Sequence, residues 1–255
     1  MTVKSFQRHD ISDELWAIVA TFFPDTKGKR GRPAGDNRTF FNGVLWVMRT
    51  GSPWRDLPEW YGNWNSVFVR FRRLAKSGFW EMLNAKMIDD PDWEWVMIDA
   101  SHIKVHQHGM SARGGTEDAG RTKGGINTKM HAAVDANGLP INFVITAGNI
   151  ADCTQATQLL EGLSPEYILA DKGYDADAII EFVQSIPAEA VIPPKNNRKD
   201  QRYYDTYIYK LRHLVENYFQ KIKNWRSLAT RYVKTTLSFS SYLYIFNALM
   251  WAKLQ

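Results

Sequence analysis

Apolar positions in the first 90 residues recur at the three- to four-residue spacing of amphipathic helices. The first such run follows Ser12, whose hydroxyl can cap a helix that continues through Phe22 and Phe23. A segment rich in Pro, Gly and basic residues then interrupts the pattern. Three further helices are predicted, at about 38–50, 65–76 and 79–88. The first third of the chain is therefore predicted to be all-helical.

Beyond Pro91 the pattern changes to the two-residue alternation of strands. Strands are predicted at 93–99, 167–170 and 190–192, and a hairpin is predicted around the turn Ala136-Asn137-Gly138. Helices are predicted at about 155–160, 176–185, 204–225 and 239–253. This order is typical of a mixed α/β sheet with helices on its faces, as in ribonuclease H-like nucleases and integrases. We expect a helical domain at 1–90 and an α/β domain at 91–255.

The composition, 44% hydrophobic and 13% aromatic over 255 residues, is typical of a globular protein. Cys153 is the only cysteine, which excludes an intramolecular disulfide or a cysteine-based zinc cluster and suits a reducing compartment. The N-terminal sequence lacks the apolar stretch of a secretory signal, and the most apolar segment, SYLYIFNALMW, is too short to span a bilayer. We therefore expect a cytoplasmic protein without a membrane partner.

Basic residues gather in two segments, and the net charge is +5. Residues 27–38 contain five Lys or Arg against one acid, and residues 195–202 contain four against one. Basic loops of this kind are typical of contacts to phosphate groups. The alternative is that both segments are ordinary loops kept solvated by charge.

Two aspartates come directly after predicted strands. Asp99 ends the segment WVMID, and Asp171 ends YILAD. Side chains at strand ends emerge where the connecting loops leave the sheet, which is a common place for an active site. Each aspartate can instead simply begin a turn.

The predicted helix 204–225 carries a polar stripe beside its apolar face. At about 100° per residue, four of its side chains fall within a sector about 60° wide. They are Tyr209, Arg212, Glu216 and Lys223. A solvent-exposed Arg–Glu pair at i,i+4 would give part of the same pattern. With the two aspartates, however, the stripe supplies a third carboxylate flanked by cations.

At these positions the chain resembles a known family of enzymes. The spacing of Tyr209, Arg212, Glu216 and Lys223 is similar to the Y-R-E-K signature of insertion-sequence transposases, and Asp99 and Asp171 complete their DDE triad. Phrases such as LADKGYDAD, VIPPKNNRK and HLVENYFQKIKNWR resemble the IS-five-like branch. The resemblance covers nearly the whole chain, and no signature residue is substituted. It implies a ribonuclease H-like DDE catalytic domain preceded by a helical DNA-binding domain.

The resemblance also implies a metal site. Three converging carboxylates repel one another unless a cation neutralises them, and hard oxygen ligands suit Mg²⁺ or Mn²⁺. Two such ions about 3.5–4 Å apart can serve an in-line phosphoryl transfer. By analogy with the family, Asp99 would bridge the ions, Asp171 would bind one and Glu216 the other. Tyr209, Arg212 and Lys223 would contact DNA.

Other basic residues are candidates for DNA contacts. Arg30 and Arg32 resemble an arm for an A·T-rich minor groove, although a flexible linker is the plainer interpretation. The predicted helix 65–76 carries three arginines and is a candidate recognition helix, with a solvated basic face as the alternative. Those arginines are Arg70, Arg72 and Arg73. Four further basic candidates belong to the α/β domain: Lys123, Lys129, Lys195 and Arg198.

The resemblance implies a transposase that binds the terminal inverted repeats of its element, cleaves DNA and joins the freed 3′-hydroxyl to target DNA. A homodimer is expected because two ends must be paired. Two alternatives remain: a domesticated or stand-alone metal-dependent endonuclease of the same fold, and a DNA-binding regulator whose carboxylate site is inert.

Overall fold

The computed structural model describes residues 7–24, 35–110, 117–199 and 201–253. The chain divides into two compact units. Unit 1 comprises residues 1–87, 224–229 and 237–255, and unit 2 comprises residues 88–223 and 230–236. Among the described helices, none is long and apolar enough to cross a membrane.

Unit 1 is helical, as the sequence predicts. Its α-helices are α1 (Asp13–Ala20), α2 (Asn37–Thr50), α3 (Trp64–Lys76), α4 (Phe79–Met87), α9 (Arg226–Ala229) and most of α10 (Thr236–Ala252), with short 3₁₀ turns at η1 (Trp54–Asp56) and η2 (Glu59–Tyr61). Side-chain oxygens of Ser12 and Asn63 cap α1 and α3, which explains where these helices begin. Gly51 ends α2 with a φ of 69°, a left-handed conformation that glycine adopts without strain.

The core of unit 1 brings together segments from both ends of the chain. Phe71 of α3 packs against Tyr242 of α10, with ring centroids 5.2 Å apart. The Ser227 hydroxyl donates a hydrogen bond to the Val47 carbonyl oxygen at 2.9 Å. The sequence pattern predicts the C-terminal helix as part of the domain 91–255, whereas by its contacts most of α10 belongs to the helical unit.

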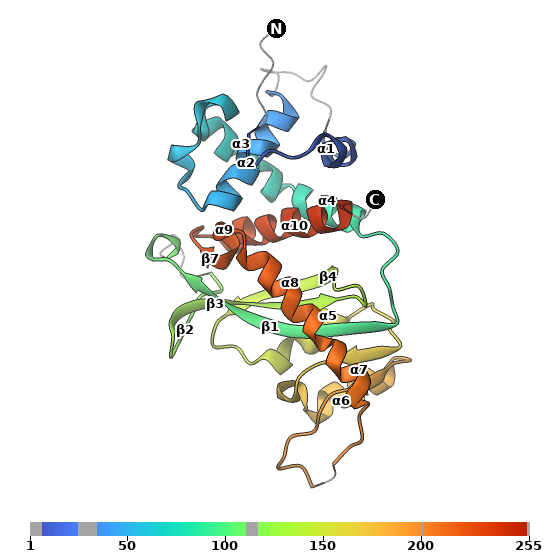
Figure 1. Cartoon of the computed structure of the whole chain (residues 1–255). Helices are drawn as coiled ribbons and strands as arrows, with labels where there is room; N and C mark the ends of the chain where they lie inside the picture. Colours follow the sequence, from blue (N-terminus) through green and yellow to red (C-terminus); the bar gives the residue numbers. More distant parts are fainter. Residues whose placement is uncertain (1–6, 25–34, 111–116, 200, 254–255) are drawn as a thin grey trace. The chain divides into compact units, whose positions relative to one another are not determined.

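Unit 2 is built on one mixed sheet. Its strands are β1 (Trp95–Val105), β2 (Gly120–Thr122), β3 (Gly125–Val134), β4 (Pro140–Ala147), β5 (Tyr167–Leu169), β6 (Glu189–Val191) and β7 (Thr230–Arg231). The main order is β2-β3-β1-β5-β6, with β4 beside β3 and β7 beside β1 (Figure 1). β1 is antiparallel to β3 and parallel to β5. The structure thus confirms the predicted α/β class and adds two strands, β2 and β7, that the sequence pattern did not predict.

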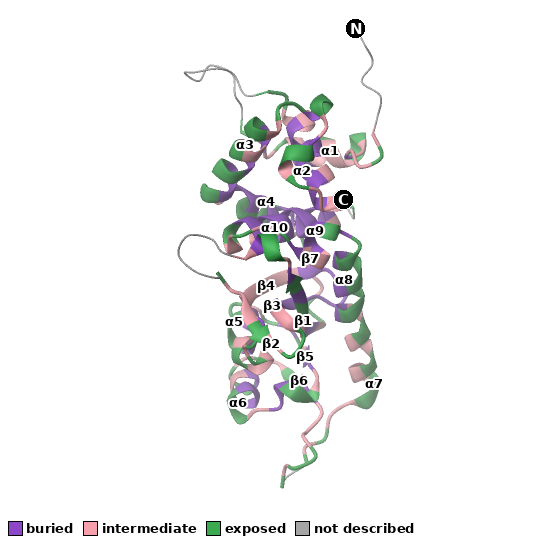
Figure 2. Cartoon of the chain, turned by 90° about the vertical axis from the view of Figure 1, so that its left-hand side faces the viewer, coloured by how far each residue is buried: buried purple, intermediate pink, exposed green. Residues whose placement is uncertain are grey.

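Helices cover both faces of this sheet. On one face α5 (Ala156–Leu160) and α6 (Asp177–Ser185) pack on buried residues of β1, β3 and β5. On the other face lie α7 (Thr206–Tyr209) and α8 (His213–Lys223), so that the strands stand between the two helical layers (Figure 2). Short 3₁₀ turns complete the unit at η3 (Gln107–Gly109), η4 (Asp152–Gln155), η5 (Lys172–Tyr174) and η6 (Lys210–Arg212). The candidate site lies on the α8 face.

Candidate active site

Asp99 lies in the middle of a strand. The sequence pattern predicts Asp99 at a strand end, which is wrong, because β1 continues for six residues beyond it to Val105. The continuation is stabilised by antiparallel pairing with β3 as far as Lys104 and by parallel pairing with β7. Asp99 therefore sits on the rigid central strand of the sheet.

Asp171 follows the neighbouring strand at the same level. β5 ends at Leu169, and the parallel register pairs Leu169 with Met97 of β1. Counting two residues onward from each partner brings Asp171 beside Asp99, on the same face of the sheet. The Asp171 Oδ1 accepts a hydrogen bond from the Gly173 backbone N–H at 2.7 Å, which orients the carboxylate.

The pKa of Asp99 is affected by its burial and by the nearby Asp171. Burial raises the pKa of the Asp99 carboxyl above its ordinary value, and the nearby charge of Asp171 raises it further. The Ala100 backbone N–H, 2.7 Å from Oδ1, and the Arg212 guanidinium oppose this rise. A partly buried carboxylate beside a second one is a site at which a cation is favourable.

Glu216 reaches the site through Arg212. The Arg212 Nη1 donates to Asp99 Oδ2 at 2.9 Å, and its Nη2 donates to the Glu216 Oε1. Despite the burial that opposes it, the charges of Asp99 and Glu216 raise the pKa of Arg212. The helix predicted at 204–225 is not continuous, since η6 separates α7 from α8. Arg212 lies in that turn, one residue before α8.

The three carboxylates do not form a finished metal cage. Within the described ranges, no group of three or more His, Cys, Asp or Glu side chains is arranged to hold a metal ion. Asp99 and Asp171 suit a hard cation such as Mg²⁺, which often uses one or two carboxylates and completes its shell with water and substrate phosphate. Glu216 is 48% exposed and is bound by Arg212 instead. Its participation requires that it leave this ion pair.

Two residues close to Asp171, Tyr174 and Asp175, are not among the predicted site residues. Tyr174 is 1% exposed, and its hydroxyl is buried without a hydrogen-bond partner among the described residues. Burial, together with the charges of Asp99 and other acids, raises its pKa. Asp175 is buried and binds the basic segment 195–202. The segment DKGYD carried this signal, because a second acid follows Asp171 by four residues.

Several predicted DNA contacts lie on the surface. Lys223 at the end of α8, Lys123 between β2 and β3, and Arg72 and Arg73 on α3 are exposed. Tyr209 is half-buried and packs edge-on against Tyr204, with ring centroids 5.6 Å apart. All of these side chains stay candidates for contacts to DNA.

Two of the predicted contacts in unit 2 are engaged inside the protein. Lys129 is buried on β3, and its ammonium binds the Ile150 carbonyl oxygen at 2.7 Å and the Asp152 carboxylate at 2.8 Å. Arg198 is held by Asp175 and Asp177. Both side chains are thus engaged by acidic partners in the described residues, and their contact with DNA stays a prediction.

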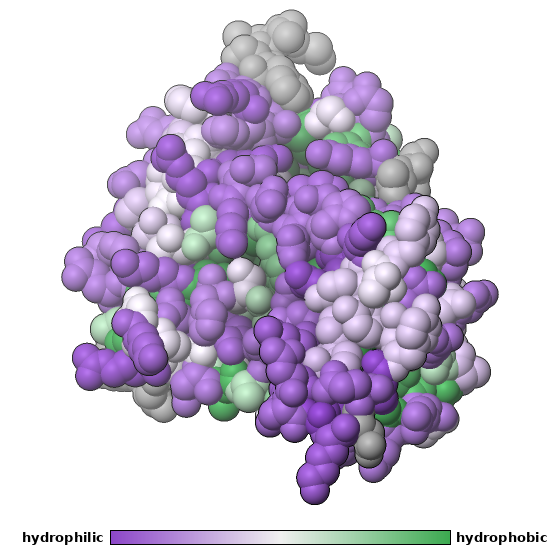
Figure 3. Space-filling view, turned by 60° about the horizontal axis from the view of Figure 1, so that its bottom comes forward, coloured by the Kyte–Doolittle hydropathy of each residue, from purple (hydrophilic) through white to green (hydrophobic). Residues whose placement is uncertain are grey.

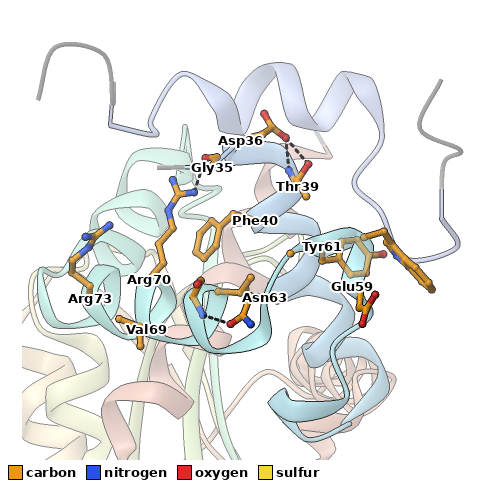
Figure 4. Close-up of a pocket in the computed structure, with 14 residues that line it drawn as sticks. Gly35, Asp36, Thr39, Phe40, Glu59, Tyr61, Asn63, Val69, Arg70 and Arg73 are labelled. Carbon is orange, nitrogen blue, oxygen red and sulfur yellow. Dashed lines mark hydrogen bonds between the residues drawn. The ribbon is translucent and has the colours of Figure 1, made fainter. Parts of the chain in front are cut away.

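Arg70 also has an internal role in unit 1. Its guanidinium lies 4.2 Å from the centroid of the Phe40 ring and donates to the Gly35 carbonyl oxygen at 3.1 Å (Figure 4). Arg70 and Arg73 line a groove of about 680 Å³ between the start of α2, η2 and α3. Arg30 and Arg32, the predicted minor-groove arm, lie outside the described residues.

Comparison with known proteins agrees with this arrangement. Residues 11–84 match the family described as "Putative transposase of IS4/5 family", and residues 94–239 match "Transposase DDE domain". A putative transposase for insertion sequence element IS6501 of Brucella ovis is 38% identical over 130 residues, which are 50% of this chain and all of that protein. An uncharacterised protein, y4sN, of Sinorhizobium fredii is 39% identical over 127 residues, 49% of this chain and 95% of that protein.

The fold is also similar to that of a solved structure. A piggyBac transposase in a synaptic complex with hairpin DNA superimposes with a TM-score of 0.54 at 12% identity. The match covers 92% of this chain and 68% of that one, and it supports a ribonuclease H-like fold. Because the DDE match spans more than half of the residues, the chain belongs to the DDE transposases of the IS4/IS5 insertion sequences, enzymes that act on DNA.

Proposed function

We propose that this transposase binds the terminal inverted repeats of its own element, cleaves there and transfers the freed 3′-hydroxyl to target DNA, using Asp99, Asp171 and Glu216. One observation carries the proposal. The register of β1 and β5 brings Asp99 and Asp171 to the same level, and Arg212 links Asp99 to Glu216. Side chains distant in sequence thus meet on one face of a rigid sheet.

Members of this family generally depend on a divalent metal ion. When bound, Mg²⁺ or Mn²⁺ supplies Lewis acidity that activates an attacking oxygen and stabilises the leaving oxygen of a phosphodiester. Asp99 and Asp171 are the residues that would hold it first. Once Arg212 releases Glu216, the Glu216 carboxylate would join them as a ligand and would help to hold a second ion.

Arg212 would change partners when DNA enters. A guanidinium presents two parallel N–H donors, a geometry that suits phosphate as well as carboxylate. In the free protein both of its amino groups are bound to acids. A backbone phosphate offers an alternative partner, with Tyr209 and Lys223 on the same helical stripe. Transfer of Arg212 to DNA would leave Glu216 free beside Asp99.

The helical unit would recognise the transposon end. Arg72 and Arg73 on the exposed side of α3 are the candidate contacts there, together with Arg30 and Arg32. Lys123 and Lys195 would contact the backbone from unit 2. Since two ends must be cut and joined in one event, we expect the active form on DNA to be a homodimer.

Cleavage of a labelled transposon end tests the proposal. Asp99→Ala should abolish Mg²⁺-dependent nicking, because it removes a carboxylate from the rigid strand. Glu189→Gln, an exposed position on the edge strand β6, should nick at the wild-type rate. Nicking by Asp99→Ala would refute the assignment. Transfer of a pre-cleaved 3′ end separates a transposase from a simple nuclease, and absence of nicking in the wild type would favour an inert regulator.

A further inference from the structure

Asp175, a buried carboxylate four residues after Asp171, binds three residues of the basic segment 195–202. The Asp175 side chain is 0% exposed. Its Oδ2 accepts hydrogen bonds from the Lys195 backbone N–H at 2.7 Å and from Arg198 Nε at 2.6 Å, and its Oδ1 accepts one from Arg202 Nη2. Burial alone would raise the pKa of Asp175, but these donors outweigh it and lower the pKa to about 2. The carboxylate is therefore ionised and fully engaged.

Apart from its contacts to Asp175, the described part of segment 195–202 forms hydrogen bonds mainly within itself. The Lys195 carbonyl oxygen accepts from the Arg198 backbone N–H at 3.0 Å and from Gln201 Nε2 at 3.1 Å. A further contact to the body of unit 2 comes from Arg198 to Asp177, which is 77% exposed. Residue 200 lies outside the described residues. The carboxylate of Asp175 is thus the buried anchor of a polar, strongly basic loop, whose described residues lie near the lower end of unit 2 in Figure 1. The view from below in Figure 3 shows many hydrophilic residues at this end.

This anchoring places a cation beside a proposed metal ligand. Lys195 and Asn196 form one wall of a groove of about 380 Å³, and Asp171, Lys172 and Gly173 form the other. The Lys195 ammonium donates one hydrogen bond, to the Asp175 carbonyl oxygen at 3.0 Å. An ammonium has three donors, so two remain for a ligand. Two lysines across a groove from each other suit a phosphate group on the strand that Asp171 would help to cut.

We infer that Asp175 is a positioning residue for DNA cleavage: it holds the loop 195–202 so that Lys195 grips a backbone phosphate next to Asp171. The inference rests on the proposed function, since it presumes that Asp171 faces the scissile strand. Asp175 itself does not touch DNA. Its effect passes through the backbone of Lys195, to which it is bonded directly.

Asp175→Asn tests the inference in the full chain, with Asp177→Asn as the matched control. Both substitutions remove one negative charge from a partner of Arg198, but only the first removes the anchor of Lys195 and Arg202. By hydrogen-exchange mass spectrometry, Asp175→Asn should exchange at least about tenfold faster in peptides covering 195–202. Exchange in β1 and β3 should be unchanged. Asp177→Asn should leave the loop near wild type.

Cleavage kinetics on an end duplex supply the functional readout. Asp175→Asn and Lys195→Gln should each raise the KM for DNA about five- to tenfold. The double variant should be no worse than either single one, because both act on the same contact. Unchanged loop exchange in Asp175→Asn, an unchanged KM, or additive effects in the double variant would overturn the inference.

A second variant covers the case in which Asp175→Asn does not fold. Arg202→Gln removes one peripheral donor, 28% exposed, and leaves Asp175 paired with Arg198. It should give a smaller rise in loop exchange and KM, and a wild-type KM with a loosened loop would count against the inference. Loop exchange is measured without DNA or metal, so it is independent of the proposed function, which fails separately if Asp99→Ala retains nicking.

Discussion

Arg212 is the residue on which the state of the site depends. It is 18% exposed and is shared by Asp99 and Glu216, which lie 113 residues before it and four residues after it. A single guanidinium therefore neutralises two of the three proposed metal ligands. In the absence of DNA, this positive side chain would therefore compete with a metal ion for the proposed ligands.

Removal of that competitor should strengthen metal binding to the free protein. Arg212→Gln takes away two partly exposed ion pairs, together worth on the order of 1–2 kcal/mol. We expect Mn²⁺ to bind about tenfold more tightly by isothermal titration calorimetry without DNA. Lys223→Gln, on the same helical stripe but exposed, should keep the wild-type affinity. Equal or weaker binding by Arg212→Gln would show that the guanidinium does not compete with the ion.

His131 gives the protein a measurable pH dependence. It is buried on β3, and its Nε2 lies 2.8 Å from the Thr146 hydroxyl. Burial, with the nearby cations Lys129 and His102, lowers its pKa from 6.5 to about 4. As the pH falls, His131 is therefore protonated at a higher pH in the unfolded chain than in the folded protein. Stability from this group is complete above pH 7 and declines between about pH 6.5 and pH 4.

This shift predicts a loss of about 2 kcal/mol in the free energy of unfolding between pH 7 and pH 5. The measurement is chemical denaturation of the wild type and of His131→Gln at both pH values. The pH-dependent loss should be smaller in His131→Gln by about that amount. In His213→Gln, an exposed position on α8, it should match the wild type. An identical loss in His131→Gln and the wild type would contradict the assignment.

At the scale of single elements, close packing beside β3 depends on one glycine. A Cβ at Gly148 would lie 2.7 Å from the Asn127 carbonyl oxygen and 2.8 Å from its Cβ, both too close for a real contact. Gly148 also donates its backbone N–H to that same carbonyl oxygen at 2.9 Å. The chain can leave β4 at this point only without a side chain.

Gly148→Ala should therefore destabilise the protein by about 1–3 kcal/mol, as overpacking usually does. That corresponds to a fall in Tm of roughly 2–4 °C per kcal/mol for a unit of this size, read by differential scanning calorimetry. Gly124→Ala is the matched control, because the nearest atoms to its Cβ would be 3.8 and 4.0 Å away. Equal Tm values for the two variants would show that the backbone after β4 can shift to accommodate a Cβ atom at little cost in stability.

The elements also show what the sequence could predict. α1, α2 and α3 begin and end near the predicted residues because caps such as Ser12 and Asn63 and the terminator Gly51 act locally. β7 was not predicted, since its two residues are fixed by pairing with Lys104 and Val105, more than 120 positions earlier. The break in the helix 204–225 was missed as well, because the 3.6-residue periodicity does not register one 3₁₀ turn.

For the candidate site, the sequence predicts which residues take part but not which side chains they bind. The spacing of Arg212 and Glu216 predicted that they share a helical face, and the structure joins them by an ion pair. The residues next to Arg212 in the sequence do not indicate that it also binds Asp99. In the same way, neighbouring residues do not indicate that Lys129 forms an ion pair with Asp152 or that Arg198 forms one with Asp175. Such long-range pairs depend on sheet register and loop anchoring, which a single sequence does not encode visibly.

At the scale of the whole molecule, the two compact units share the chain unequally. The catalytic sheet is one nearly continuous stretch, 88–223, whereas the helical unit takes its N-terminal residues and adds 224–229 and 237–255. Arg49 of α2 lies 3.6 Å over the Trp225 ring, so the segment that follows α8 is part of the helical core. Along the sequence, the residues that follow α8, the helix that carries Glu216, therefore belong to the unit proposed to read the transposon end.

The most direct measurement is anomalous diffraction from crystals of the full chain with an end duplex and Mn²⁺. We expect a manganese peak with oxygens of both Asp99 and Asp171 about 2.1 Å away, and the Glu216 side chain turned from Arg212 towards the ion. Manganese bound elsewhere would contradict it. So would a cleavage-competent complex in which Arg212 still joins Asp99 to Glu216.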